Sequence, residues 1–141
     1  MNRLYPALAA LSMIAWSAAI FLPAILVNAR MNATLQYPGG TLLMFGALGP
    51  LAGIVAWYAN LPLAVMTYRL LDNRAPHIAL SAIACALAAS PLLGFKMPGP
   101  HEGADGGPAH YLIGGWLWLA AFTPPMLASL IDIVRRRRIP T

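Results

Sequence analysis

Four long apolar stretches constrain the fold of this chain more than any other feature of its sequence. They run approximately over residues 4–27, 41–68, 77–95 and 111–134. Each is close to or above the about 20 helical residues that cross the roughly 30 Å hydrocarbon core of a bilayer. Because lipid offers no partner to a free backbone N–H or C=O, each stretch should satisfy its own hydrogen bonds as a helix. The sequence therefore predicts an all-α membrane protein with four transmembrane helices in an up-down bundle, forming a single membrane domain over residues 1–141.

The composition supports this class of protein. Of the 141 residues, 60% are hydrophobic and only 9% are charged, whereas about 25% are charged in a typical soluble domain. The net charge of +5 comes largely from the run Arg135, Arg136, Arg137 and Arg138, which directly follows the last apolar stretch. A basic run in that position is typical of an anchor to anionic lipid, so we expect the bilayer and no nucleic acid as its partner.

Basic residues also predict the orientation. With the N-terminus in the cytoplasm, seven Lys and Arg residues fall on the cytoplasmic side and only two, Arg30 and Lys96, fall outside. The positive-inside rule then places both termini in the cytoplasm. Residues 1–29 leave an alternative open, because Val27-Asn28-Ala29 resembles a signal-peptidase site. The apolar run is about 23 residues, longer than the 7–15 of a signal peptide, so we expect an uncleaved helix.

The second stretch contains the sequence WYANLP, residues 57–62, which places an asparagine and a proline inside an apolar segment. Pro62 predicts a kink, because its ring lacks a hydrogen-bond donor and clashes with the carbonyl of Tyr58. The side-chain amide of Asn60 can reach such a freed carbonyl or a group on a neighbouring helix.

Small and polar residues predict which faces turn toward the bundle interior. In the second stretch a face with steps of three and four carries Gly46, Gly49, Gly53, Trp57, Asn60, Ala64 and Thr67. Such a face allows close helix approach in a bilayer. Ser12 and Trp16 share a face in the first stretch, and Gly115 and Trp118 share one in the last. The third stretch is small on nearly every side, which predicts a tightly enclosed helix. The predicted helix-packing or partner-binding residues are Gly46, Gly49, Gly53, Trp57, Asn60, Pro62, Gly115 and Trp118.

One predicted outer loop carries residues with metal-ligand chemistry: His101, Glu102, Asp105 and His110. Imidazole nitrogens and carboxylate oxygens could together bind a divalent ion. However, HEGAD lacks the second histidine of a helical HExxH site, and the glycines and prolines around it leave the ligands unpositioned. We expect a solvated loop and no metal or other cofactor.

Residue types needed for catalysis are missing from the apolar stretches. None has Asp, Glu, Lys or Arg near its middle, where a proton relay or charge-coupled pump would need a titrating group. We find no nucleophile-and-base pattern and no phosphate-binding glycine loop. Cys85 is the one cysteine, and we interpret it as a small core residue. We do not expect an enzyme.

Three segments resemble a group of small bacterial inner-membrane proteins. They are WYANLP, the pair Glu102-Gly103, and YLIGGWLWLAAF at residues 111–122. The group carries a Trp-x-Ala-Asn-Pro element and a late Gly-x-x-x-Trp-Leu element. Leu61 separates Asn60 from Pro62, which departs from the first element. The resemblance implies a four-helix inner-membrane protein and no particular activity.

These features favour a non-catalytic inner-membrane protein that acts through helix–helix contacts with another membrane protein, as an accessory subunit or an immunity-type partner. The alternative is a small oligomeric transporter or channel component in which Trp57 and Asn60 line a path. A third hypothesis is a metal-handling membrane protein that uses His101 and His110.

Overall fold

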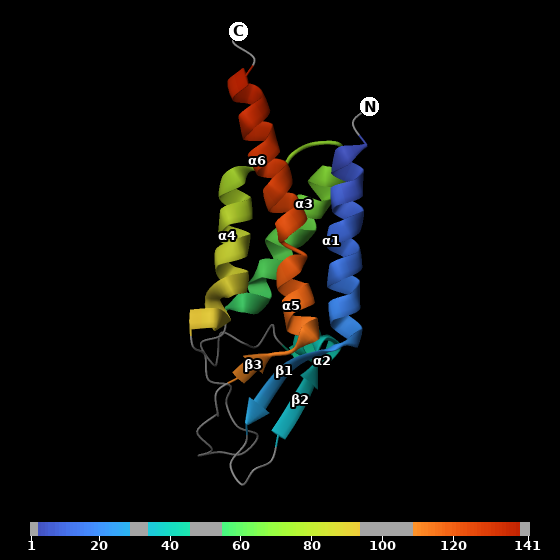
Figure 1. Cartoon of the computed structure of the whole chain (residues 1–141), viewed down its shortest axis with the longest axis vertical. Coiled ribbons are helices and arrows are strands. Elements are labelled where there is room, and N and C mark those ends of the chain that lie inside the picture. The colour runs from blue at the N-terminus through green and yellow to red at the C-terminus, as the bar shows by residue number, and fades with distance from the viewer. Residues whose placement is uncertain (1–2, 29–33, 46–54, 94–108, 139–141) are drawn as a thin grey trace.

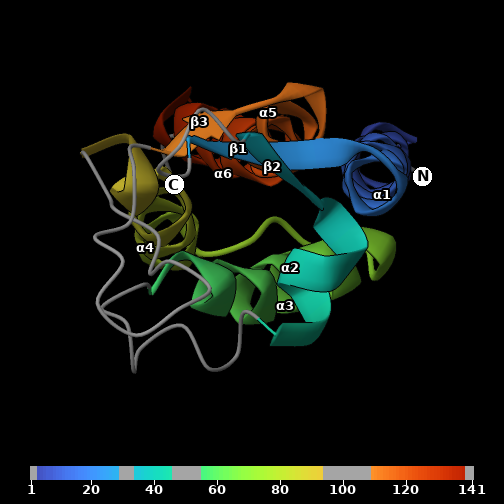
Figure 2. The ribbon, with the colours of Figure 1, turned by 90° about the horizontal axis from the view of Figure 1, so that it is seen from below.

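The described part of the chain is mostly helical, with a small sheet at one end (Figure 1). The structure is a computed structural model that describes residues 3–28, 34–45, 55–93 and 109–138. The main helices are α1 (Leu4–Phe21), α3 (Asn60–Leu71), α4 (Ile78–Ala89), α5 (Ile113–Ala120) and α6 (Thr123–Arg138). They lie side by side, with α1 against α3, α5 and α6, and α4 against α3 and α6 (Figures 1 and 2). The prediction of a predominantly helical chain is confirmed.

A three-stranded antiparallel sheet corrects the prediction that the chain is entirely helical. Its strands are β1 (Pro23–Asn28), β2 (Thr34–Pro38) and β3 (Ala109–Tyr111), in the order β2-β1-β3. Ile25 of β1 pairs with Tyr37 on one side and Tyr111 on the other. The sheet therefore joins the segment after the first helix to the segment before α5.

The first apolar stretch is part helix and part strand. α1 ends at Phe21, and Leu22 is extended, with φ −101° and ψ 154°. Pro23 explains this end, because its ring disfavours helical geometry in the preceding residue. Residues 23–28 form β1, so the prediction that they continue the helix is wrong. Ala24 and Ile25 are apolar residues of this strand and are buried in a cluster with Tyr37, Leu42 and Tyr111.

The second stretch is not one helix across its described residues. α2 (Gly39–Phe45) ends before residues 46–54, which lie outside the described residues. After Val55, which is outside a helix, the described chain forms the 3-10 helix η3 (Ala56–Ala59), followed directly by α3. Pro62 is the third residue of α3, where a helix has no intrahelical partner for the N–H that proline lacks. Pro62 therefore lies in the first turn of α3, directly after η3, and not in the interior of one long helix as predicted.

The third and fourth stretches also depart from single uniform helices. α4 continues into the 3-10 helix η4 (Ser90–Leu93). The last stretch opens in β3, and its helix is interrupted at Ala121 and Phe122, before the paired prolines of the first turn of α6. Proline is tolerated at those positions for the reason that applies to Pro62.

Two helical segments are long and apolar enough to cross a membrane, judged by length and composition: Leu4–Phe21 and Ile113–Arg137. α4 is a shorter apolar helix. α3 and α4 have 12 residues each, which corresponds to about 18 Å of helix at 1.5 Å per residue. In the described part of the chain, two of the four predicted spans, the first and the last, thus contain a helical segment long enough to cross a membrane.

Large side chains from one helix meet small ones from another in the core. Leu63 and Met66 of α3 lie in one buried cluster with Ala84 and Ala88 of α4 and with Phe122. A second cluster, nearer the start of α1, contains Tyr5, Leu8, Ala9, Leu70 and Ala128. Small residues at a helix interface let backbones approach closely, which strengthens the packing contacts on which association in a bilayer depends.

Three buried serines hold the helices together through hydrogen bonds. The hydroxyl of Ser12 donates to the carbonyl oxygen of Ala121 at 2.7 Å, which joins α1 to the break between α5 and α6. The hydroxyls of Ser81 and Ser129 lie 2.8 Å apart and join α4 to α6. Each bond occupies a polar group that would be costly to leave unpaired in an apolar interior.

Glycines hold α2 against the end of α1. A Cβ atom built on Gly39 would overlap the backbone carbonyl oxygen of Ala19, whereas one built on Gly40 would lie 3.4 Å from the carbonyl oxygen of Ile20. The backbone N–H of Gly39 also donates to the carbonyl oxygen of Leu22 at 3.1 Å. Close backbone approach therefore depends on Gly39 more than on Gly40.

We expect Gly39→Ala to lower the free energy of unfolding by about 1–3 kcal/mol, because backbone atoms must move to admit the methyl group. The measurement is an SDS unfolding titration of the purified protein in detergent micelles, followed by tryptophan fluorescence. Gly40→Ala is the matched control and should change stability much less. Equal losses in the two variants would contradict this account of the contact between α1 and α2.

Candidate functional site

The polar centre of the helical region is a group of four side chains that we call the Asn60 junction: Trp16, Trp57, Asn60 and Trp118. Trp16 lies in α1, Trp57 in η3, Asn60 at the start of α3 and Trp118 in α5. All four side chains are partly buried. The junction thus draws on three of the predicted apolar stretches.

Hydrogen bonds connect all four members. The indole Nε1–H groups of Trp118 and Trp16 both donate to the Oδ1 atom of Asn60, at 2.9 and 3.1 Å. The Nδ2 group of Asn60 donates to the carbonyl oxygen of Trp57 at 2.9 Å. The indole of Trp57 donates to the carbonyl oxygen of Leu43 in α2 at 2.8 Å. Two indole donors therefore share one carboxamide oxygen, which matches its two lone pairs.

Local geometry explains how Trp57 and Asn60 come together. They are three residues apart across the end of η3, and in a 3-10 helix residues i and i+3 lie on the same side. The amide of Asn60 can then bond the carbonyl of Trp57, rather than the carbonyl of Tyr58 that the kink hypothesis assigned to it. The WYANLP sequence thus forms a helix start that presents an amide oxygen to the neighbouring helices.

The structure brings together some of the residues predicted from sequence and separates others. Trp57, Asn60 and Trp118 meet in the junction, and Pro62 lies two residues further along α3. Gly115 is buried, and a Cβ there would lie 2.6 Å from the carbonyl oxygen of Ala24, so it belongs to the contact between α5 and β1. Gly46, Gly49 and Gly53 lie outside the described residues.

The inward face of α3 is offset from the predicted one. The buried residues of η3 and α3 are Ala56, Ala59, Leu63, Met66 and Leu70. Trp57, Asn60 and Thr67 are partly buried, whereas Ala64 is exposed. The prediction assumed that small residues mark the buried face. Here the large side chains of α3 turn inward because α4 supplies small ones, including Ala84 and Ala88.

Small size also misled the prediction for α4. Ser81, Ala84 and Ala88 are buried, whereas Ala79, Ala82 and Ala86 are exposed. The prediction of a tightly enclosed helix is wrong for the described residues, which cover only one face of α4.

The predicted metal candidates do not form a site within the part of the chain that the structure describes. His101, Glu102 and Asp105 lie outside the described residues, and His110 lies exposed in β3. Among residues 3–28, 34–45, 55–93 and 109–138, no group of three His, Cys, Asp or Glu side chains could hold a metal ion.

The predicted site residues include Trp57, Asn60 and Trp118 but not Trp16 or the buried serines. The sequence does predict an inward face with Ser12 and Trp16 in the first apolar stretch, and Ser12 is buried and Trp16 partly buried. A polar group in an apolar stretch needs a partner, and counting the polar groups of each stretch would have pointed to pairing between stretches.

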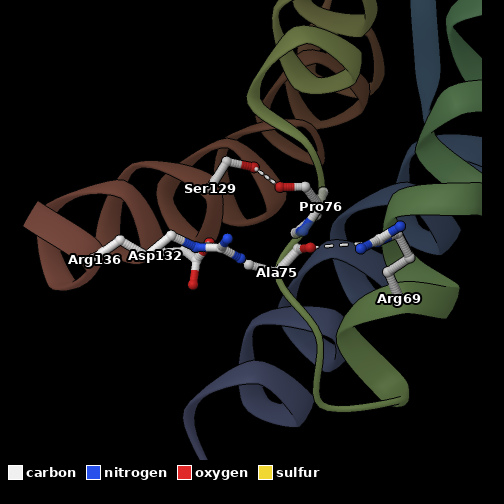
Figure 3. A network of polar contacts seen from close by, with 6 residues as sticks. All are labelled: Arg69, Ala75, Pro76, Ser129, Asp132 and Arg136. Carbon is white, nitrogen blue, oxygen red and sulfur yellow. Dashed lines mark hydrogen bonds and ion pairs between the residues drawn. The ribbon is translucent and has the colours of Figure 1, made fainter. Parts of the chain in front are cut away.

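At the end remote from the sheet, polar bonds fix the connection between α3 and α4 (Figure 3). The Nε group of Arg69 donates to the carbonyl oxygen of Ala75 at 3.3 Å. The hydroxyl of Ser129 donates to the carbonyl oxygen of Pro76 at 3.0 Å. Nearby on α6, Asp132 and Arg136 form an ion pair at 2.7 Å. The connection is thus held to α3 on one side and to α6 on the other.

Basic residues gather at this same end. The start of α1, the connection between α3 and α4, and the end of α6 all lie there (Figure 1). The described arginine side chains at this end are Arg3, Arg69, Arg74, Arg135, Arg136 and Arg137. The described carboxylates are Asp72, which pairs with Arg74 at 3.2 Å, and Asp132. This end therefore carries a surplus of positive charge.

Comparison of the chain with protein-family models, with curated proteins and with solved structures gives no match.

We expect Asn60→Leu to lower the free energy of unfolding by about 2 kcal/mol, because two indole N–H groups lose their acceptor in an apolar interior. An SDS unfolding titration in micelles measures the change. Thr67→Val replaces a partly buried polar residue on the same helix and is the matched control, with a smaller expected loss. If Thr67→Val lowers the free energy of unfolding as much as Asn60→Leu does, the Asn60 junction contributes no more to stability than other partly buried polar positions.

Ser12→Ala should cost about 1 kcal/mol, since it removes the bond to Ala121 across the break between α5 and α6. Ser17→Ala, at an exposed position of α1, should leave the unfolding curve nearly unchanged. If both variants behave alike, the Ser12 bond does not hold the two helices together.

Proposed function

We propose that the chain is a non-catalytic, four-span protein of a bacterial inner membrane, with both termini in the cytoplasm. It acts through helix–helix contacts with another membrane protein, as an accessory subunit or an immunity-type partner. The cytoplasmic end also binds anionic lipid through the arginine run at residues 135–138.

The observation that carries this proposal is the internal pairing of the polar groups. Among the described residues, every buried side-chain nitrogen and oxygen has a hydrogen-bond partner within the chain. The oxygen of Asn60 accepts both indole N–H groups. These groups serve the packing of the chain itself, so recognition falls to its outer surface, which along the helices is largely apolar.

The dimensions of α1 support the membrane setting. Its 18 residues extend about 27 Å, close to the roughly 30 Å hydrocarbon core. Large apolar side chains are exposed along α1 and α6, including Leu11 at 56% and Leu127 at 50%. Contact with lipid accounts for these side chains, and the arginines at one end agree with a cytoplasmic boundary.

The outer face of α4 is the surface best suited to a partner helix. Ala79, Ala82 and Ala86 are exposed there at helical spacing beside Ile83, which is 57% exposed, and the small side chains let the backbone of a second helix come close. The outer face of α1 presents the large side chains of Leu11, Met13 and Ile14 beside the exposed Ala7 and Ala10, and the large side chains suit contact with lipid. The outer face of α4 is therefore the position to test for a partner helix, and the outer face of α1 is the control.

A photo-crosslinking amino acid at position 82, in protein expressed at its native level, should give one discrete adduct with another membrane protein. The same group at position 11 should not. Ala82→Trp should abolish co-purification of that partner in mild detergent at unchanged stability, while Leu11→Trp retains it. A monomer without any adduct at either position would overturn the proposal.

Asn60→Leu separates this proposal from a transporter or channel. If the chain acts by binding another membrane protein, Asn60→Leu should lower its stability or its assembly with the partner, because the two indole hydrogen bonds are lost. Loss of a solute flux in vesicles at unchanged assembly would instead support the transport hypothesis.

A further inference from the structure

The short helix α2 has one side fixed to the protein. Gly39 and Gly40 lie against the backbone of Ala19 and Ile20 at the end of α1. Leu42 packs against the buried cluster of the sheet, and the carbonyl oxygen of Leu43 accepts the indole N–H of Trp57. Contacts to α1, the sheet and η3 therefore fix how α2 is turned about its own axis.

The other side of α2 carries large apolar side chains with no cover from the described chain. Met44 is 76% exposed and Phe45 is 63% exposed. Phe21, the last residue of α1, is 85% exposed. α2 thus has one side that is partly buried against the protein and a second, apolar side that the described chain leaves uncovered.

The position of α2 relative to α1 defines its depth in a bilayer. Because α1 is about as long as the hydrocarbon core is thick, an α1 that begins at one boundary of the core ends near the other. The bond from Gly39 to the carbonyl of Leu22 holds the start of α2 at that second boundary. In Figure 2, α1 is seen nearly end-on whereas α2 runs across the view, so α2 lies across the long axis of the molecule.

Aromatic residues mark the same level on the neighbouring helix. α5 begins directly after the sheet, and Trp116 in its first turn is 55% exposed. Its ring lies 5.8 Å from that of Tyr111 in β3. Tryptophan and tyrosine favour the boundary between headgroups and acyl chains, so the start of α5 agrees with a membrane boundary at the level of the sheet.

We infer that α2 is an interfacial helix that lies in the membrane plane and inserts Met44 and Phe45 among the upper acyl chains of the outer leaflet. Its ligand is the boundary region of the phospholipid, where apolar side chains of surface helices are buried just below the headgroups. The inference rests on the membrane setting of the proposed function and adds a second kind of lipid contact to it.

The test measures the depth of single labels in the full-length protein. Met44→Cys, Leu11→Cys and Gln36→Cys are made in a Cys85→Ala background, labelled with the environment-sensitive dye NBD and reconstituted in liposomes of phosphatidylcholine and phosphatidylglycerol. Quenchers are aqueous iodide and phospholipids that carry a spin label either near the headgroup or near the end of the acyl chain. Phe45→Cys gives an independent report should the Met44 variant fail to reconstitute.

The label at Met44 should lose the iodide quenching seen at Gln36, which is exposed on β2. It should respond more strongly to the spin label near the headgroup than to the deep one, whereas the label at Leu11 should show the reverse order. Iodide quenching at Met44 equal to that at Gln36, with Leu11 still in lipid, overturns the interfacial helix and leaves the membrane setting intact. Equal depth of Met44 and Leu11 also overturns it. Iodide quenching at Leu11 itself contradicts the proposed function.

Discussion

The shared hydrogen bonds at Asn60 are the interaction around which the helices are arranged. In a bilayer apolar surface gains little by leaving lipid, so helices associate through close packing and through polar groups that need partners. One carboxamide oxygen accepts donors from α1 and α5, and its amide group secures η3. These bonds fix which residues of α1, η3 and α5 lie at the same level along the helices. The buried serines add bonds from α1 to Ala121 and from α4 to α6.

Sequence reasoning reached the helical class and several members of the junction. Asn60, Trp57 and Trp118 are predicted because they share helix faces with small residues at steps of three and four, and the structure brings these three side chains together. The buried face of α3 was assigned less well, because small size was taken as the mark of burial. Packing needs complementary sizes, and which helix supplies the small partner is a tertiary property that one stretch does not reveal.

The sheet was missed for a related reason. Ile25 and its neighbours are apolar enough to continue a membrane helix, and hydrophobicity alone does not separate a buried strand from a buried helix segment. Pro23 carried the missing information, since the residue before a proline favours extended geometry. Pro62 and the pair Pro124-Pro125 likewise lie in the first turns of helices, so these prolines mark boundaries between elements.

Pairing between distant segments also sets an order of assembly. Trp16 and Trp118 meet on Asn60, Ser12 bonds to Ala121, and β3 adds to β1. The indole of Trp118, the carbonyl of Ala121 and strand β3 all come from the last third of the chain. During synthesis the ribosome releases the early segments first, so these contacts of α1, α3 and β1 form only after the C-terminal segments emerge. Completion of the tertiary structure is therefore a late, C-terminal event: a chain truncated before residue 109 would contain α2 and α3 as partners of α1 and β2 as partner of β1, but would lack α5, α6 and β3.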